Sequence, residues 1–404
     1  MIIEDLIKHS DDPETFLYLE RHVNSGSRTY SSFAAQSEGQ PEYQPSSQVN
    51  SFEVPCLKIP KEKVSIYLDN PNTELLKYYI HNDTVLFPVH PEIFQDDKTA
   101  FIEELRKYPS ESIRVSPTAS TRTVMTKMED IPHHFIKLHY PRRISRFIRR
   151  LRCNNIQNSI EVSKDLRCLT LPKFAYLPET IGICYGSGPE SWGFIIREYT
   201  PRPVTKNKIL IPMFALYAQD DKNVSDPPLL IQLIQYLNKD PATFVLSHIM
   251  QPIIEMWCTV LRSRGILFEA HGQNTLLELN SEGNPIRIIY RDLDVYVDPE
   301  IRKHHKLHIS FPNSHFINGG RSSIYSLKYD AFMGHHLFDY LASLLESFYK
   351  INPTALQEAC KETFNHNFPD ADLCFTNKTF YYSDKILLNN KCEIIETNDP
   401  PKWR

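Results

Sequence analysis

Glycine is scarce in this chain, and its scarcity removes several of the commonest folds from consideration. Only 12 of the 404 residues are glycine, whereas average usage is roughly 7%. The phosphate-binding and nucleophile loops of common enzymes need glycines at fixed spacing, and the sequence contains no G-x-x-x-x-G-K-[ST], G-x-G-x-x-G or G-x-S-x-G segment. The sequence therefore disfavours a Walker-type NTPase, a dinucleotide-binding Rossmann domain and an elbow-type hydrolase.

The length of 404 residues predicts more than one hydrophobic core, because single cores stop growing at about 250–300 residues. We expect three regions: residues 1–50 with a polar loop at 24–50, an α+β part over 51–205, and a mainly helical part over 206–404. The predicted fold class is therefore α+β, with a mixed or antiparallel sheet in the first half and helices in the second.

Charge and cysteine usage narrow the class of protein further. Lysine and arginine total 45 against 49 acidic residues, a formal net charge of −4, which favours neither nucleic acid nor an anionic membrane as partner. The N-terminus has no apolar signal segment, and no run approaches the roughly 18 apolar residues of a spanning helix. The eight cysteines are scattered without a C-x-x-C pair, so we expect reduced thiols and a soluble, cytoplasmic protein.

The apolar pattern predicts elements along the whole chain. Strands are expected at 65–68, 85–88, 181–185, 192–199, 275–279 and 286–290, and the last four should form two hairpins. Helices are expected at 73–81, 99–107, 242–265, 324–349 and 353–366.

The segment from Lys137 to Arg152 carries the most concentrated charge. Its seven cations have no acidic residue between them: Lys137, Arg142, Arg143, Arg146, Arg149, Arg150 and Arg152. A helix over 141–153, with proline in its first turn, would place Arg142, Arg146 and Arg149 on one face. Such a face suits a polyanion such as a nucleotide triphosphate. The alternative is a solvated face paired with acids elsewhere.

Two further polar segments could form a binding site. Ser116–Thr123 is rich in hydroxyl groups around Arg122, which can bind phosphate oxygens, although such turns are also common without a ligand. The residues 269–274, EAHGQN, lie between an apolar helix end and an apolar strand. Four strongly hydrogen-bonding side chains there are costly to bury, so we expect them to face a cleft.

Acidic residues follow the predicted hairpin. Asp292 and Asp294 point to one side of an extended segment, a geometry suited to a hard cation carried by phosphates, and the hairpin would bring Asp292 near Glu269. The alternative is that Asp292 pairs with Arg291 or another surface arginine. The histidines at 304 and 308, 133–134 and 335–336 lack a ligand set for a metal, and we interpret them as structural or surface residues.

Together these segments resemble the NRPS-independent siderophore synthetases, the aerobactin-synthetase-like IucA/IucC family. The resemblance covers roughly residues 50–390. It rests on 87–91 (FPVHP), Ser116–Val124, the spacing from Lys137 through Ser145 to Arg149, 269–274 (EAHGQN) and 290–292 (YRD). It implies a cupped-hand fold of thumb, fingers and palm, with most of the thumb missing here, and members that are often homodimers.

The resemblance also implies an activity. Family members adenylate a carboxylic acid such as citrate with ATP and Mg²⁺, release pyrophosphate, and then condense the acyl group with an amine or hydroxylamine as AMP leaves. By resemblance, ATP is bound by Ser120, Arg122, Thr123, Lys137, Gln273 and Asn274. The carboxylate substrate is held by Ser145, Arg149, His271 and Lys385, with Arg149, His271 and Lys137 catalytic, and Mg²⁺ is served by Asp292 and Glu269.

The sequence departs from the family pattern in one segment, and this departure leaves other functions as alternatives. Residues 26–40 lack the outer histidine-proline-lysine motif of the family. A noncatalytic relative that binds nucleotide or carboxylate and acts through a protein partner is therefore the main alternative. A nucleic-acid surface on 137–152 and a small-molecule kinase, suggested by 290–294 (YRDLD), are further alternatives.

Overall fold

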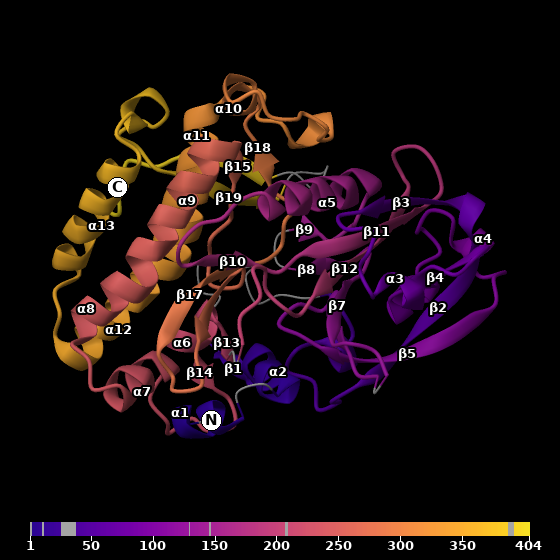
Figure 1. The fold of residues 1–404 in the computed structure, drawn as a ribbon, viewed down its shortest axis with the longest axis horizontal. Helices are drawn as coiled ribbons and strands as arrows, with labels where there is room; N and C mark the ends of the chain where they lie inside the picture. The colour runs from indigo at the N-terminus through magenta and orange to yellow at the C-terminus, as the bar shows by residue number, and fades with distance from the viewer. Residues whose placement is uncertain are drawn as a thin grey trace.

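The computed structural model describes residues 2–9, 12–25, 38–128, 130–144, 147–206, 209–386 and 392–404. They form two cores joined along the middle of the molecule (Figure 1). In Figure 1 the first core, a large sheet, lies on the right, and the long helices of the second core lie on the left. The expectation of an α+β fold with its sheet first and its helices second is confirmed.

The first core is built on an eight-stranded sheet in the order β3-β11-β12-β7-β6-β5-β2-β4. Every neighbouring pair in it is antiparallel. Its strands are β2 (Phe52–Pro60), β3 (Val64–Leu68), β4 (Thr84–Pro88), β5 (Ser110–Pro117), β6 (Thr123–Thr126), β7 (His134–Lys137), β11 (Glu179–Tyr185) and β12 (Trp192–Glu198). The short helices α3 (Leu76–Tyr79) and α4 (Ile102–Leu105) contribute to the same core.

Helix α5 (Cys153–Arg167) packs against the sheet at β11. The close approach requires Gly182, because a Cβ there would lie 2.4 Å from Cγ2 of Ile156. Cys153 at the start of α5 forms a disulfide with the buried Cys184 of β11. The expectation that all eight cysteines are reduced is therefore wrong for this pair, because the packing of helix on sheet brings together two residues 31 positions apart.

The second core surrounds a four-stranded sheet in the order β10-β17-β16-β13. Only the β10–β17 pair of this sheet is parallel. Its strands are β10 (Phe174–Tyr176), β13 (Ile209–Pro212), β16 (Thr275–Leu279) and β17 (Pro285–Tyr290). Both predicted hairpins, β11–β12 and β16–β17, are confirmed.

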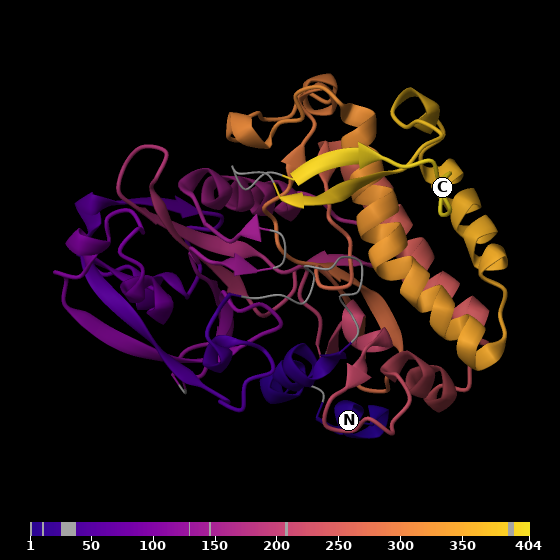
Figure 2. The same cartoon turned by 180° about the vertical axis from the view of Figure 1, so that it is seen from behind.

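Helices complete the second core. They are α6 (Met213–Tyr217), α7 (Leu229–Tyr236), α8 (Pro241–Val245), α9 (Gln251–Arg264), α10 (Pro299–His304), α11 (Arg321–Ser326), α12 (Asp339–Tyr349) and α13 (Pro353–Asn367). Single π-type segments, Leu246–Met250 and Leu327–Phe338, join α8 to α9 and α11 to α12. The short pairs are β15 (Ile266–Leu267) with β18 (Tyr296–Val297) and β19 (Phe380–Ile386) with β20 (Cys392–Glu396), the latter in yellow in Figure 2.

The continuous helix Pro241–Arg264 is long and apolar enough to cross a membrane by length and composition alone, but 67% of its most apolar window is buried in the protein. It ends as predicted at Gly265, which adopts φ 66°. Its apolar side belongs to the second core, so its hydrophobicity is explained by packing.

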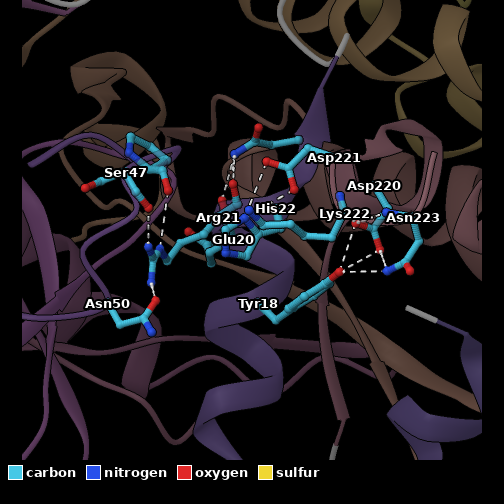
Figure 3. Close-up of polar contacts among 12 residues, drawn as sticks. Tyr18, Glu20, Arg21, His22, Ser47, Asn50, Asp220, Asp221, Lys222 and Asn223 are labelled. Carbon is cyan, nitrogen blue, oxygen red and sulfur yellow. Dashed lines mark hydrogen bonds and ion pairs between the residues drawn. The ribbon is translucent and has the colours of Figure 1, made fainter. Parts of the chain in front are cut away.

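The N-terminal residues pack on the second core. Helices α1 (Ile3–Lys8) and α2 (Pro13–His22) lead into β1 (Val23–Ser25), which pairs with β14 (Gln219–Asp220). Figure 3 shows how α2 is held: the Tyr18 hydroxyl donates to Asp220 at 2.9 Å, and the Arg21 guanidinium donates to the Ser47 carbonyl at 2.8 Å. The boundaries expected at residues 50 and 205 stay a prediction.

The basic helix predicted over 141–153 is wrong. This segment instead forms a small hairpin of β8 (Arg143–Ile144) and β9 (Phe147–Ile148), and the helix starts only at Cys153. Two isoleucines and a phenylalanine favour strands, and seven nearby cations would repel one another on a helix. Arg142, Arg143 and Arg152 pair with Glu92, Glu38 and Glu190. Pairing with acids elsewhere agrees with the solvated-face alternative, but Glu92 is fully buried, so this face is not wholly solvated. Arg146 lies outside the described residues.

The other expected elements are present with shifted ends. The helices expected at 73–81 and 99–107 are only single turns, α3 and α4. In both places a short apolar run flanked by polar residues is too short to sustain a longer helix.

A buried ion pair near the C-terminus gives a test of this packing. The Arg404 and Asp330 side chains are 6% and 3% exposed and lie 2.8 Å apart. Because Arg404→Ala leaves a carboxylate buried without its counter-charge, we expect the free energy of unfolding to fall by about 3–5 kcal/mol. Urea unfolding followed by fluorescence measures this change.

Lys402→Ala is the matched control, since this side chain is 60% exposed, and it should change stability by less than about 0.5 kcal/mol. Equal unfolding midpoints for the two variants would contradict the role assigned to the buried pair.

Candidate active site

A cavity of ≈ 430 Å³ opens between the eight-stranded sheet and the second core. It is lined from the first core by the β5–β6 turn, β7, β12 and the β8–β9 hairpin, and from the second by residues 269–274, residues 291–294 and the segment Leu327–Phe338. Ten of the twelve predicted site residues line it: Ser120, Arg122, Thr123, Lys137, Arg149, Glu269, His271, Gln273, Asn274 and Asp292.

The structure describes the other two predicted site residues only in part. Ser145 lies outside the described residues. Lys385 belongs to β19 (Phe380–Ile386), whose Tyr381 and Tyr382 line the cavity. The backbone of β19 therefore runs beside the cavity, and the assignments of Ser145 and Lys385 stay predictions.

The serine-rich turn is held by its own hydroxyl groups. Thr118 Oγ1 donates to the Thr123 carbonyl at 2.7 Å and accepts from the Ser120 amide at 3.3 Å. These bonds fix the turn between β5 and β6 without glycine, because threonine side chains satisfy the backbone groups. The turn thereby presents Ser120 and Arg122 to the cavity.

Two guanidinium groups, those of Arg122 and Arg149, line the cavity. Arg122 Nη1 donates to the Arg149 carbonyl at 3.2 Å, and Arg149 Nε donates to the Ile144 carbonyl at 3.2 Å. Among the described residues, no carboxylate lies within ion-pairing distance of either arginine. Burial, together with the charge of Arg149, lowers the pKa of Arg122 to about 10. Asp292 and Asp294 act on Arg122 through space and raise its pKa, but they do not pair with it directly. Two like charges without a direct ion-pair partner in one cavity favour the binding of an anion.

A chain of ion pairs contributes Lys137, Arg197 and Asp292 to the lining of the cavity. Lys137, at the end of β7, pairs with Asp292, and Arg197 of β12 lies 3.6 Å from the same carboxylate while pairing with Glu179 at 2.5 Å. Burial of Asp292 opposes its ionisation, but the charges of Lys137 and Arg197 more than offset this effect and hold its pKa well below its ordinary value. Asp292 also adopts φ 75°, an uncommon conformation for a non-glycine residue.

The turn that holds His271 fixes its protonation state. The Gln273 amide donates to His271 Nδ1 at 3.2 Å, so the neutral imidazole carries its proton on Nε2. Burial lowers the pKa of His271 to about 4. Gly272 allows the tight turn, because a Cβ at this position would lie 2.2 Å from the Tyr217 hydroxyl oxygen. The ring is therefore a neutral hydrogen-bond donor near pH 7.

Glu20 and Arg291 are cavity residues that the sequence did not reveal. Glu20, on α2, accepts from Arg291 Nη2 at 2.7 Å and from the Ala119 amide at 3.0 Å. Arg291 also donates from Nε to the Gln273 carbonyl at 2.7 Å. One carboxylate of the N-terminal helix thus connects the serine-rich turn with the turn that carries His271. No local pattern marks Glu20, which lies 271 positions from its partner.

The two predicted magnesium ligands each carry a cationic partner. Asp292 pairs with Lys137, and Glu269 pairs with the buried Lys328. Within the residues described, no group of three or more His, Cys, Asp or Glu side chains is placed to hold a metal ion. Because Mg²⁺ commonly uses one or two carboxylates and takes its other ligands from phosphates and water, the site fits a cation that arrives with a nucleotide.

The histidines singled out in the sequence lie in three different environments. His304 and His308 are exposed, which confirms their interpretation as a surface run. His335 and His336 instead line the cavity from the segment Leu327–Phe338. His90 of the FPVHP segment is fully buried in the first core against Tyr43 and Tyr140 and does not line the cavity.

The Glu20–Arg291 pair predicts a stability effect. These side chains are 1% and 6% exposed, so Glu20→Ala should lower the free energy of unfolding by about 3–5 kcal/mol, because Arg291 stays buried without its partner. Thermal unfolding measures the change. Glu14→Ala on the same helix is the control: Glu14 is 59% exposed in its pair with Lys127 and should contribute no more than about 1 kcal/mol. Equal losses in both variants would contradict this account.

The environment of His271 predicts that the free energy of unfolding depends on pH. An unfolded histidine titrates near 6.5, whereas folding lowers the pKa of His271 to about 4. Its contribution to stability is therefore complete above pH 6.5 and is lost as the pH falls toward 4. Imidazole ¹⁵N NMR, with His271→Gln to assign the signal, should show a neutral Nε2–H ring at pH 6. A midpoint near 6.5 would refute this prediction.

Two protein-family models match separate parts of the chain. The family model described as IucA / IucC family matches residues 22–218, and the model described as ferric iron reductase FhuF-like transporter matches residues 244–370. No match is found among curated protein sequences.

Solved structures share the fold of the whole chain at low identity. The petrobactin biosynthesis protein AsbB from Bacillus anthracis has 17% identity and a TM-score of 0.64, over 97% of this chain and 77% of that chain. ATP-bound aerobactin synthetase IucA from a hypervirulent Klebsiella pneumoniae pathotype has 14% identity and a TM-score of 0.71, over 99% and 80%. Aerobactin synthetase IucC from the same source has 16% identity and a TM-score of 0.64, over 90% and 70%.

These structural likenesses show the fold, and the family model covers the segments that carry the serine-rich turn, Lys137 and Arg149. The expected fold similarity is confirmed. Residues 22–218 thus match the IucA/IucC family, and the whole chain shares its fold with siderophore synthetases named in that family.

Proposed function

We propose that the protein is an ATP-dependent ligase that adenylates a carboxylic acid, such as citrate, and joins it to an amine or hydroxylamine. The observation that carries this proposal is the pair of guanidinium groups, Arg122 and Arg149, that face one cavity without a carboxylate partner among the described residues. A triphosphate and a polycarboxylic acid are both polyanions, and such a pair binds them through charge-assisted hydrogen bonds.

The cavity offers each substrate a separate set of donors. Ser120, Arg122, Thr123, Lys137, Gln273 and Asn274 line it on the side proposed for ATP. Arg149 and neutral His271 would hold the acid, the first by charge and the second through Nε2–H. Ser145 and Lys385 complete the proposed acid site. The ATP bound to a structural neighbour supports the choice of nucleotide.

Adenylation then follows from position and charge. A carboxylate oxygen of the acid bonds to the α-phosphorus of ATP, and the bond to the leaving pyrophosphate breaks. The amine nitrogen then forms a C–N bond with the acyl carbon, the C–O bond to AMP breaks, and the nitrogen loses a proton. Lys137 and Arg122 stabilise charge on the phosphates and thereby lower the barrier.

Asp292 and Glu269 are the residues proposed to hold Mg²⁺ that arrives with ATP. When bound, the ion neutralises phosphate charge in the transition state. In its absence the two carboxylates form ion pairs with Lys137 and Lys328. A cytoplasmic location fits a reaction that consumes ATP.

One observation favours a second candidate. Because the family's outer histidine-proline-lysine motif is missing from residues 26–40, a noncatalytic relative would bind nucleotide or carboxylate without turnover and act through a protein partner. Such a protein would bind ATP but release no pyrophosphate, which separates it from the ligase.

The test is acid-dependent release of pyrophosphate together with trapping of the acyl group by hydroxylamine, with citrate first in a panel of acids. Arg122→Ala should lower both rates roughly 10–100-fold, since a hydrogen bond to a charged group contributes about 1.5–3 kcal/mol. Arg150→Ala is the matched control, because Arg150 is exposed and does not line the cavity. Bound ATP with no pyrophosphate for any acid would favour the noncatalytic candidate.

A further inference from the structure

A second cavity of ≈ 470 Å³ adjoins the first and reaches the disulfide. Glu269, Asp294 and Tyr382 line both cavities. Cys153 lines the second cavity, whereas Cys184 is fully buried. We propose that Cys153–Cys184 is a thiol–disulfide exchange site, opened by a small thiol that enters through the second cavity, and that its redox state changes the affinity of the first cavity for nucleotide. The effect on nucleotide rests on the proposed function, whereas the exchange itself does not.

The setting of the pair suits reversible exchange. In the cytoplasm, where the protein is proposed to act, structural thiols stay reduced, and the disulfides that do form there are usually redox-sensing or catalytic. Cys153 is the first residue of the 15-residue helix α5. The N-terminus of a helix stabilises a thiolate, which is the form that attacks an incoming small disulfide.

Each step of the exchange balances. A small thiolate bonds to Cys153 Sγ, the bond to Cys184 Sγ breaks, and the Cys184 sulfur takes up a proton. A second thiolate then bonds to the small-molecule sulfur of this mixed disulfide, and Cys153 leaves as a thiolate. The pair is thereby reduced by two electrons, while two small thiols are oxidised to one disulfide. The reverse reaction uses a small disulfide as the oxidant.

Packing keeps the two cysteines together in both redox states. Helix α5 lies against β11 (Figure 1), and the Cα atoms of Cys153 and Cys184 are 5.7 Å apart, a spacing typical of disulfides. Ile156 of α5 belongs to the same apolar cluster as Cys184 and lies against Gly182. The Cys153 amide donates to the Ser191 carbonyl at 3.3 Å. These contacts do not involve the sulfur–sulfur bond, so the pair can close again after it opens.

The disulfide holds the first turn of α5. Among the described residues, the N-cap residue Arg152 provides no side-chain capping hydrogen bond, so the covalent bond stabilises a turn that lacks the usual cap. From this half of the helix, Asn155 Nδ2 donates to Asp294 at 3.0 Å and Asn158 Nδ2 donates to the Val295 carbonyl at 2.9 Å. The start of α5 is therefore bonded to the sheet of the first core and to residues 294–295 of the second.

Asp294 connects the disulfide with the first cavity. It lines that cavity two residues after Asp292, and it also accepts from His315 Nε2 at 3.0 Å. When the disulfide opens, the first turn of α5 frays more readily, and Asp294 loses the fixed position of its Asn155 donor. The nucleotide should then bind less tightly, because a wall that is not preorganised must be ordered on binding.

The test compares the two redox forms of the folded, full-length protein. Dithiothreitol supplies both thiols of the exchange and glutathione disulfide is the oxidant, while alkylation followed by peptide mass spectrometry reports the linked fraction of the pair. Amide hydrogen exchange follows residues 156–158, and calorimetry gives the Kd for Mg-ATP. Cys153→Ser removes the pair at its half-buried member. Cys168→Ser is the matched control, since Cys168 is an exposed free thiol at the other end of α5.

We expect dithiothreitol to open the pair in the folded protein, to speed hydrogen exchange at residues 156–158, and to raise the Kd for Mg-ATP about three- to tenfold. Glutathione disulfide should reverse all three changes. Cys153→Ser should show the weaker affinity with and without reductant, whereas Cys168→Ser should respond like wild type.

Three results would overturn the inference: a pair that opens only in denaturant, a Kd that is equal in the two redox forms, or a response to reductant that persists in Cys153→Ser. If neither redox form binds Mg-ATP, the proposed function fails, and with it the effect on nucleotide. Opening of the pair with faster hydrogen exchange would even then support the exchange site.

Discussion

The ion pair between Lys137 and Asp292 joins the two cores at the place where the chemistry is proposed. Lys137 ends a strand of the eight-stranded sheet, and Asp292 follows a strand of the four-stranded sheet. Because Lys137 is only 1% exposed, removing Asp292 would leave a buried charge without its partner. Arg197 and Glu179 extend the chain into the first core. Lys137, Arg197 and Asp292 all line the first cavity, so this junction contributes directly to its wall.

The two neighbouring cavities differ in how their charged side chains are paired. In the first cavity, Arg122 and Arg149 have no direct carboxylate partner among the described residues. In the second cavity, lined by Arg152 and Lys328, each cation pairs with a carboxylate. The N-terminal helix takes part in this organisation, because Glu20 bridges Ala119 and Arg291. Helix α2 therefore contacts both turns that face the proposed ATP site.

The sequence predicted most of the cavity because its polar segments interrupt apolar ones. The segment 269–274 lies between a core helix and a core strand, and its hydrogen-bonding side chains face the cavity as expected. The prediction of a helix over 141–153 was wrong because it rested on the helical spacing of the arginines. It did not take into account the strand preference of Ile144, Phe147 and Ile148. Glu20 and the Cys153–Cys184 pair were missed because tertiary packing alone brings these residues to their partners.

The most direct test of the proposed adenylation follows an oxygen atom from the carboxylic acid into AMP. The protein would be incubated with Mg-ATP, hydroxylamine and citrate labelled with ¹⁸O in its carboxylates, and the phosphorus products analysed by ³¹P NMR. If a carboxylate oxygen bonds to the α-phosphorus, AMP carries one ¹⁸O atom and pyrophosphate carries none. Label in inorganic phosphate, with ADP as the nucleotide product, would contradict adenylation and indicate an acyl phosphate instead.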